Sequence, residues 1–322
     1  MSKSQMRKTT AFAPASIGNL SLGFDILGAA LCPIDNEPLG DTVEVNVAEQ
    51  TGLTVSGRFA DRLPGEAKDN IVLQCYDFFV EQLNEREMAS HPVAIHLVKR
   101  LPIGSGLGSS AASIVAALHA YNEFYQKPFN QDQLLHMMGE LEGRISGSVH
   151  YDNVAPAYLG GITLMTGDDD RPATILPAIQ GWYWVACYSG LSVSTSAARK
   201  ILPDQYSRED LLTFGRQLGV FVDALHRGDA ESASRVMHDV VAEPWRKSLL
   251  PGFDDARQQC LALNGKAFGI SGSGPTVFCV AENLDDAHKI KEYLDKHYVQ
   301  NDDGFSHICT IPDQGATAEY SE

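Results

Sequence analysis

Basic residues are scarce in this sequence. Its 322 residues include 25 Lys and Arg against 41 Asp and Glu, which gives a formal net charge of −16. Proteins that bind the nucleic-acid backbone need a basic surface, so this deficit argues against that class. The two short basic pairs, Arg7–Lys8 and Lys99–Arg100, are expected to be solvated surface charges. An acidic protein can still bind an anion where backbone amides, arginines or a metal ion supply positive charge locally.

Cysteines and long apolar runs are also few. The six cysteines stand singly, without a Cys-x-x-Cys pair, which disfavours the disulfide framework of a small secreted protein. Most of them lie in apolar stretches, where reduced core thiols are expected. No run approaches the ~20 apolar residues that a membrane-spanning helix needs. Residues 1–10 are polar and lack the apolar core of a signal peptide, so we expect a cytoplasmic protein.

The first half of the chain alternates strand and helix patterns. Period-two alternation predicts strands at 42–47 and 92–98, and apolar residues at helical spacing predict a helix over 70–83. An alanine-rich buried helix is expected over 109–125, followed by a helix from the N-cap Asn130 through Leu141 and a strand at 159–165. The acidic, proline-closed stretch 167–172 is the expected domain boundary, which divides the chain into 1–166 and 167–322.

The second half adds a strand at 183–188 and three helices over 208–227, 229–242 and 252–263. Ser207 is the expected N-cap of the first, with Asp210 in the capping-box position. Apolar runs at 267–270 and 276–280 predict two strands, followed by a helix over 284–298 and a strand at 305–311. Strands and helices mix without strict βαβ alternation, so the predicted class is α+β.

One segment carries most of the chemical information. The string LPIGSGLGSSAAS at 101–113 lies between a predicted strand and a predicted helix. Its alternate glycines permit positive φ, and their amides with the helix N-terminus form a nest suited to polyphosphate. It is not a Walker A loop, because no lysine follows the glycines, and Ser109 replaces the last glycine of a dinucleotide fingerprint. The alternative is a flexible turn between strand and helix.

Four segments together resemble the GHMP kinases, and the amino-terminal one has the form that its motif takes in homoserine kinases. The string at 101–113 resembles their second signature, APASIGNLSLGFD at 13–25 the amino-terminal one, and GISGSGPT at 269–276 the carboxy-terminal one. The run ELEGRISGSVHYDNVAP at 140–156 is similar to homoserine kinases in particular. The resemblance implies a two-domain α+β fold, with an amino-terminal ATP-binding domain, a ferredoxin-like carboxy-terminal domain and the active site between them.

The resemblance also implies a nucleotide site and a metal site. The nucleotide-binding residues would be Asn70, Pro102, Ile103, Gly104, Ser105, Gly106, Leu107, Gly108, Ser109, Ser110, Ala111 and Ala112. Ser110 and Glu142 would hold Mg²⁺, which suits a sparse set of oxygen ligands. For Asn70 the alternative is a helix N-cap, and for Glu142 a surface carboxylate at a helix end.

The acceptor implied by the resemblance is L-homoserine, phosphorylated by ATP to O-phospho-L-homoserine in threonine biosynthesis. Its ammonium would meet Asp25, and its carboxylate would meet Arg199 and Arg246, because guanidinium forks bind carboxylates bidentately. The full substrate-binding set is Asn19, Asp25, His150, Asn153, Arg199, Arg246 and Gly272, and the catalytic set is Ser110, Glu142, Asn19 and Arg246. Each arginine taken alone could be a surface residue, and His150 could be structural.

Several alternatives stay open at the level of sequence. No convincing lysine stands in the motifs to act with an aspartate as general base, so we expect catalysis by Mg²⁺, the amide nest and alignment, with the proton passing to phosphate or water. The acceptor could be another small alcohol, such as mevalonate or a sugar, or the protein could be a non-catalytic sensor. The resemblance further suggests a homodimer, and threonine, as an analogue of the acceptor, is a plausible feedback inhibitor.

Overall fold

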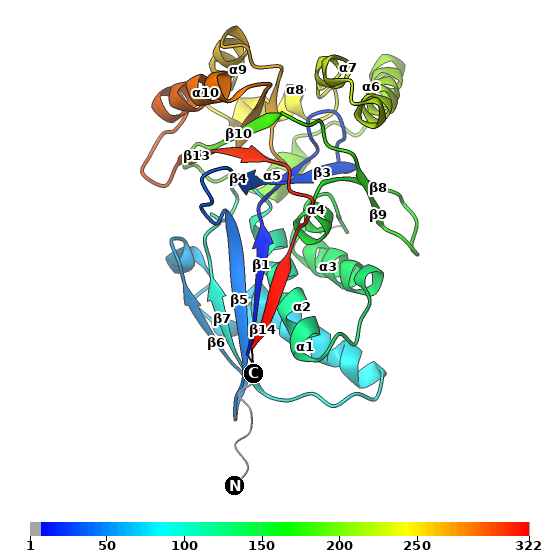
Figure 1. Ribbon diagram of the computed structural model, residues 1–322, viewed down its shortest axis with the longest axis vertical. Coiled ribbons are helices and arrows are strands. Elements are labelled where there is room, and N and C mark those ends of the chain that lie inside the picture. The colour runs from blue at the N-terminus through cyan, green and yellow to red at the C-terminus, as the bar shows by residue number, and fades with distance from the viewer. Residues whose placement is uncertain (1–7, 148, 322) are drawn as a thin grey trace.

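The computed structural model of the protein describes residues 8–147 and 149–321. Two mixed layers of sheet and helix are stacked along the long axis (Figure 1). The amino-terminal strand and the last strand lie side by side in the lower layer. Arg7 and most of the polar start of the chain are outside the described residues.

Strands and helices are mixed along the described chain without strict alternation. The strands are β1 Lys8–Pro14, β2 Ser16–Gly18, β3 Leu27–Ala30, β4 Cys32–Pro33, β5 Gly40–Val47, β6 Gly52–Ser56, β7 Val93–Val98, β8 Ile162–Met165, β9 Ala173–Leu176, β10 Tyr183–Tyr188, β11 Ala267–Ile270, β12 Val277–Ala281, β13 Phe305–Thr310 and β14 Thr317–Ser321. The helices are α1 Ile71–Glu85, α2 Ser109–Phe124, α3 Gln131–Ser146, α4 Val154–Leu159, α5 Thr195–Lys200, α6 Arg208–Arg227, α7 Ala230–Arg235, α8 Glu243–Arg246, α9 Phe253–Ala262 and α10 Leu284–His297. Short 3-10 turns are η1 Ala60–Arg62, η2 Ala67–Asp69 and η3 Lys247–Leu249.

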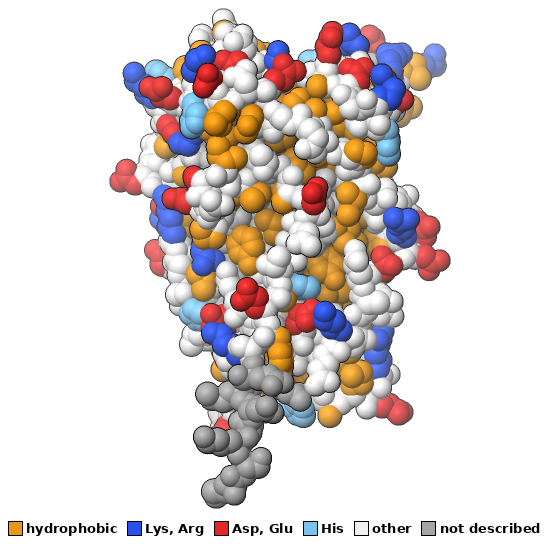
Figure 2. Space-filling model, in the orientation of Figure 1, with side chains coloured by type: hydrophobic (Ala, Val, Ile, Leu, Met, Phe, Trp, Pro, Cys, Tyr) orange, Lys and Arg blue, Asp and Glu red, His pale blue; other side chains and the backbone are white. Residues whose placement is uncertain are grey.

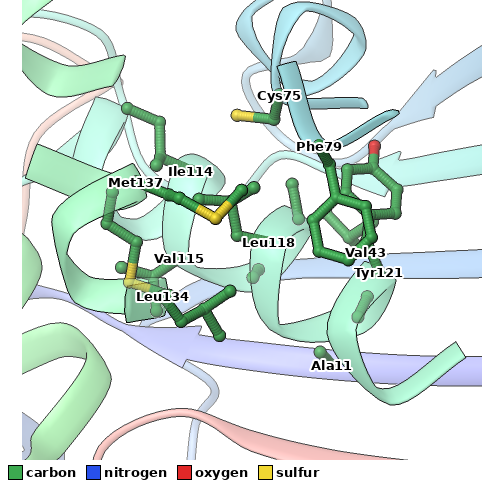
Figure 3. Close-up of a cluster of buried hydrophobic side chains, with 14 of the residues drawn as sticks. Ala11, Val43, Cys75, Phe79, Ile114, Val115, Leu118, Tyr121, Leu134 and Met137 are labelled. Atoms are coloured by element: carbon green, nitrogen blue, oxygen red, sulfur yellow. The ribbon is translucent and has the colours of Figure 1, made fainter. Parts of the chain in front are cut away.

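The lower layer is built on a five-stranded sheet of order β14-β1-β5-β7-β6. Helix α2 packs on β1 and β5 and also touches α1, α3 and α4, so nearly all of its surface is buried. Figure 3 shows this core, a cluster to which α1 contributes Phe79, α2 contributes Leu118 and Tyr121, α3 contributes Leu134 and the sheet contributes Val43. The prediction of a buried helix directly after the glycine-rich loop is confirmed.

The upper layer has a ferredoxin-like arrangement. Strands β10, β11, β12 and β13 form an antiparallel sheet of order β11-β12-β10-β13, with helices after β10 and between β12 and β13. Strand β4, from the amino-terminal part of the chain, extends this sheet beside β13. A third sheet, β2-β3-β8-β9, completes the set. The α+β class is therefore confirmed, whereas the division at 166/167 stays a prediction.

Two expectations from the sequence need correction. Lys99 is not a solvated surface charge: its side chain is only 2% exposed. The helix expected over 229–242 ends at Arg235, and α8 begins only at Glu243. Between them, the Asp239 carboxylate accepts hydrogen bonds from the backbone N–H groups of Val241, Ala242 and Glu243, which closes a turn that competes with a continuous helix.

The structure also shows how charged and hydrophobic side chains are distributed on one face and whether the cysteines are paired. On the face shown in Figure 2, acidic and basic side chains are mixed around the edges and hydrophobic ones lie over the middle. All six cysteines are free, and only Cys32 is exposed. Among the described helices, none has the length and apolar character to cross a membrane.

The core of the lower layer gives a first prediction. Leu118 is fully buried in α2, so Leu118→Ala removes packed methyl groups and should lower the free energy of unfolding by roughly 2–5 kcal/mol, as measured by urea titration. Leu211→Ala is the matched control, because Leu211 is 67% exposed on α6, and it should change stability by less than about 0.5 kcal/mol. Equal effects of the two substitutions would contradict this account of the core.

Candidate active site

A cavity of about 850 Å³ lies where the predicted motifs meet. Its wall combines the glycine-rich loop, the end of α3, the segment 192–196 before and within α5, and the turn around Gly272. Its volume falls in the range of ordinary small-molecule sites. Of the predicted residues, those on the wall are Asn19, Asp25, Ile103, Gly104, Ser105, Gly106, Gly108, Ser109, Ser110, Glu142, His150, Asn153, Arg199, Arg246 and Gly272.

The glycine-rich loop has the conformation that its alternate glycines allow. Gly104, Gly106 and Gly108 have φ of +68°, +82° and +65°, a region that disfavours other residues. At Gly106 a side chain is also excluded by space, because a Cβ there would lie 2.4 Å from the carbonyl oxygen of Ser271. The loop opens directly into the N-terminus of α2, whose free N–H groups and dipole suit an anion.

Ser110, in the first turn of α2, and Glu142, near the end of α3, lie together on the wall of the cavity. The Ser110 hydroxyl donates to Glu142 Oε1 over 2.8 Å. Burial raises the pKa of Glu142, and the bond from Ser110 and the charge of Lys99 partly offset that rise. A carboxylate and a hydroxyl are oxygen donors of the kind that Mg²⁺ prefers alongside phosphate and water. A cation there would also stabilise the ionised carboxylate, so the residues present fit a magnesium ion.

Asp25 and Arg199 also line the cavity and form a bidentate ion pair. Arg199 Nη1 and Nη2 donate to Asp25 Oδ2 and Oδ1 over 2.9 and 3.0 Å. His150 Nδ1 lies 3.9 Å from Asp25 Oδ1. Burial lowers the pKa of His150, Asp25 raises it and Arg199 lowers it further, so the imidazole is neutral near pH 7. The two residues predicted to bind opposite charges of one substrate thus face each other.

Arg246 and Asn19 converge on the carbonyl oxygen of Gly272. Arg246 Nη1 donates to it over 2.9 Å and Asn19 Nδ2 over 3.2 Å. Arg246 Nε donates to the carbonyl of Ala198 over 3.1 Å, which ties the arginine to the helix that carries Arg199. Burial lowers the pKa of Arg246, while Asp239 is the main neighbour that raises it. Both guanidinium groups lie over the ring of Phe24, at 5.1 and 5.6 Å from its centroid.

Asn153 lines the cavity and makes two side-chain hydrogen bonds. Its Oδ1 accepts from Ser16 Oγ over 2.9 Å, and its Nδ2 donates to Asp152 Oδ2 over 3.2 Å. Asp152 is 6% exposed. Burial raises its pKa to about 7, with further contributions from the negative charges of Asp25 and Glu142.

A few predicted residues stand behind the wall. Asn70 accepts from Val72 N over 3.0 Å as the N-cap of α1, the alternative given for it above, while its neighbours Asp69 and Ile71 line the cavity. Pro102, Leu107, Ala111 and Ala112 are not among the described lining residues. Their roles in nucleotide binding stay predictions.

The sequence analysis missed other lining residues, chiefly Lys99, Asp152 and the serine-rich segment 192–196. Asp152 lies within the homoserine-kinase-like run, so its position in the motif was a usable signal. The burial of Lys99 depends on a partner 58 positions earlier in the chain, Asp41, which no local pattern reveals.

Asp152 gives a prediction for the pH dependence of stability. With a pKa of about 7 in the folded protein and 3.8 as its ordinary value, it binds a proton between those pH values that the unfolded chain lacks. The free energy of unfolding therefore falls as pH rises from about 4 to 7, by up to roughly 1.4 kcal/mol per pH unit from this group. The substitution Asp152→Asn should remove that component. Between pH 4.5 and 7.5, urea titration should therefore show that the free energy of unfolding of the variant rises by roughly 2–4 kcal/mol relative to that of wild type.

The matched control is Asp204→Asn on an exposed loop, for which we expect a curve parallel to wild type. A parallel curve for Asp152→Asn as well would show that Asp152 is ionised throughout this range.

Comparison with known proteins places these features in a family. The models for the GHMP kinases N terminal domain and the GHMP kinases C terminal match residues 70–161 and 221–300. A crystal structure of homoserine kinase from Cytophaga hutchinsonii is 31% identical, with a TM-score of 0.88 over 99% of each chain. A putative homoserine kinase from Listeria monocytogenes (20% identity, TM-score 0.69, 97% and 99% covered) and L. major mevalonate kinase (15%, 0.66, 93% and 94%) share the fold. The chain belongs to the GHMP kinases and is a small-molecule kinase of that family.

Proposed function

We propose that this protein is a homoserine kinase, which transfers the γ-phosphoryl group of ATP to the side-chain hydroxyl of L-homoserine as a step of threonine biosynthesis. The observation that carries the proposal is the Asp25–Arg199 pair, with Arg246 beside it, in the same cavity as the glycine-rich loop. The likeness to the Cytophaga hutchinsonii homoserine kinase over the full chain supports it.

The ion pair favours a substrate that carries both charges. The ammonium of an amino acid can replace Arg199 as the partner of Asp25, and its carboxylate can replace Asp25 as the partner of the arginines. No charge is then left unpaired. An uncharged alcohol offers neither replacement, and a substrate with one charge would cover the pair and leave one partner without a counter-charge, which is unfavourable. Both side chains of the pair are about one-third exposed, so this exchange needs little rearrangement of the surrounding core.

ATP would bind with its phosphates on the loop 101–108 and the N-terminus of α2. Ser110 and Glu142 would hold Mg²⁺, which supplies charge neutralisation to the phosphates during transfer. The Ser109 hydroxyl is engaged with the carbonyl of Leu101 over 3.1 Å, so among these two serines Ser110 is the one directed to the acidic partner.

Transfer itself forms a bond between the acceptor oxygen and the γ-phosphorus and breaks the bond from that phosphorus to the β–γ bridging oxygen. The hydroxyl proton passes to the transferred phosphoryl group or to water, because Asp25 is committed to the substrate ammonium. The protein contributes alignment and electrostatic stabilisation, which dominate phosphoryl transfer. Asn19 holds the Asp25 backbone N–H over 3.0 Å and so fixes the carboxylate that orients the acceptor.

Two alternatives remain distinguishable. A kinase for mevalonate or a sugar would keep the phosphate end and would gain nothing from Asp25 and Arg199. A non-catalytic sensor would tolerate loss of the metal carboxylate, whereas Glu142 and Ser110 are in contact here. We also propose that threonine, with the same two charges as homoserine, competes for the acceptor site, and that the protein forms a homodimer.

The deciding experiment is ADP release by purified protein with Mg²⁺-ATP and a panel of homoserine, serine, threonine, mevalonate, galactose and no acceptor. We expect metal-dependent turnover with homoserine and competition by threonine. Turnover with mevalonate or galactose alone would overturn the acceptor assignment, and silence from folded, ATP-binding protein would favour the sensor. Sedimentation velocity of the same sample tests the dimer.

The acceptor site gives a prediction about specificity. Arg199→Met should raise the KM for homoserine about 100-fold and leave the KM for ATP within about threefold, because a charge-assisted bidentate contact is lost only at the acceptor end. Asp25→Asn should also act mainly on homoserine affinity. Arg227→Ala, which breaks an exposed ion pair on α6, is the control and should change neither constant. Loss of turnover in Asp25→Asn at unchanged homoserine affinity would assign Asp25 a role in proton transfer instead.

A further inference from the structure

A buried ion pair lies directly beneath the glycine-rich loop. Lys99, at the end of β7, and Asp41, in β5, are 2% and 0% exposed. Their charged atoms are 2.5 Å apart. Burying two charges is unfavourable unless every donor and acceptor is satisfied, so a pair in this place is expected to make a full set of bonds.

The observed bonds saturate both groups. The Lys99 ammonium donates to Asp41 Oδ2, to the carbonyl oxygen of Ser109 over 2.8 Å and to Ser113 Oγ over 3.0 Å, which uses its three protons. Asp41 Oδ2 also accepts from Ser113 Oγ over 2.7 Å. Asp41 Oδ1 accepts from the backbone N–H groups of Arg100 and Leu101, over 2.8 and 3.1 Å.

These bonds hold both ends of the phosphate loop. At the start of the loop 101–108, Asp41 accepts from the backbone N–H groups of Arg100 and Leu101. Directly after its end, Lys99 donates to the carbonyl oxygen of Ser109. The loop is otherwise rich in glycine and would have many conformations available. One ion pair therefore fixes the distance between the two ends of the loop and the direction in which α2 leaves it.

Lys99 borders the cavity, but its side chain is only 2% exposed and its ammonium already has three protein acceptors. Asp41 is fully buried and is not among the described residues that line the cavity. Neither group is therefore placed to exchange a proton with an acceptor hydroxyl. Their position instead lets them determine whether the loop amides are aligned before phosphate arrives, the kind of pre-organisation that raises affinity.

We propose that Asp41 and Lys99 are positioning residues that hold the ends of the loop 101–108 in the conformation that binds the phosphates of ATP. The proposal rests on the loop as the ATP phosphate site and is independent of which alcohol is the acceptor. It predicts that disruption of the pair weakens binding of phosphates more than binding of the nucleoside.

The test separates positioning from stability with paired variants. Lys99→Met or Asp41→Asn alone leaves one buried charge without its partner and should lower Tm by about 10 °C. In the double variant Asp41→Asn/Lys99→Met both substituted side chains are uncharged, and the new amide oxygen can still accept from the backbone N–H groups. Most of the decrease in Tm seen in the single variants should therefore be recovered. Its Kd for MgATP should nevertheless stay about 10-fold above wild type, while its Kd for adenosine stays within about twofold.

The outcomes are distinct. A double variant with recovered Tm and wild-type affinity for MgATP would overturn the proposal, as would equal weakening of MgATP and adenosine, which indicates general disruption. Lys266→Met/Glu282→Gln, a surface pair 3.0 Å apart in the upper layer, is the control and should alter none of these values.

Ser113→Ala keeps the test open if the double variant fails to fold. This variant removes only the hydroxyl that bridges both charged groups, and it should raise the Kd for MgATP about threefold with little effect on adenosine. Unchanged affinity for MgATP in this variant would count against the proposal. Because these are binding measurements, a negative result in the homoserine assay does not affect them.

Discussion

The contact between two glycine-rich turns is the constraint on which the cavity depends. Ser271 Oγ donates to the carbonyl of Gly106 over 2.6 Å, and the Thr276 N–H donates to the carbonyl of Ser105 over 3.0 Å. A side chain at position 106 would separate these backbones. Because Gly272 in the same turn accepts from Arg246 and Asn19, the contact that holds the loop 101–108 also places these two side chains relative to it.

The sequence predicted best what is encoded locally. Helix α6 and strands β10 and β11 have the expected bounds, and Ser207 with Asp210 forms the expected capping box. Each depends on neighbours within a few positions. Strands β1 to β4, β6, β9 and β14 were not predicted. Some of their pairings join distant parts of the chain, as β1 with β14 and β4 with β13, and no local pattern reveals such a pairing. Burial of Lys99 was missed for the same reason, since its partner lies on another strand.

The candidate site was more predictable than its surroundings, because its residues stand in recognisable motifs. What those motifs could not give is how the residues contact one another. Asp25 and Arg199 were assigned to opposite ends of one ligand, and in the structure they bind each other. The pKa of Asp152 is raised first by burial and then by the charges of Asp25 and Glu142, and only the three-dimensional structure could reveal either cause.

The charges that line the cavity explain why the site needs more than arginines. The lining residues include the basic Lys99, Arg144, Arg199 and Arg246 and the acidic Asp25, Asp69, Glu142 and Asp152, so the formal charge of these side chains balances. Lys99 is already neutralised by Asp41, and Arg199 by Asp25. Little side-chain charge is left for a triphosphate in a protein of net charge −16. The loop amides, the N-terminus of α2 and a divalent cation must therefore carry most of the attraction, and these depend on backbone geometry, which is why the conformation of the loop matters more than any single basic residue.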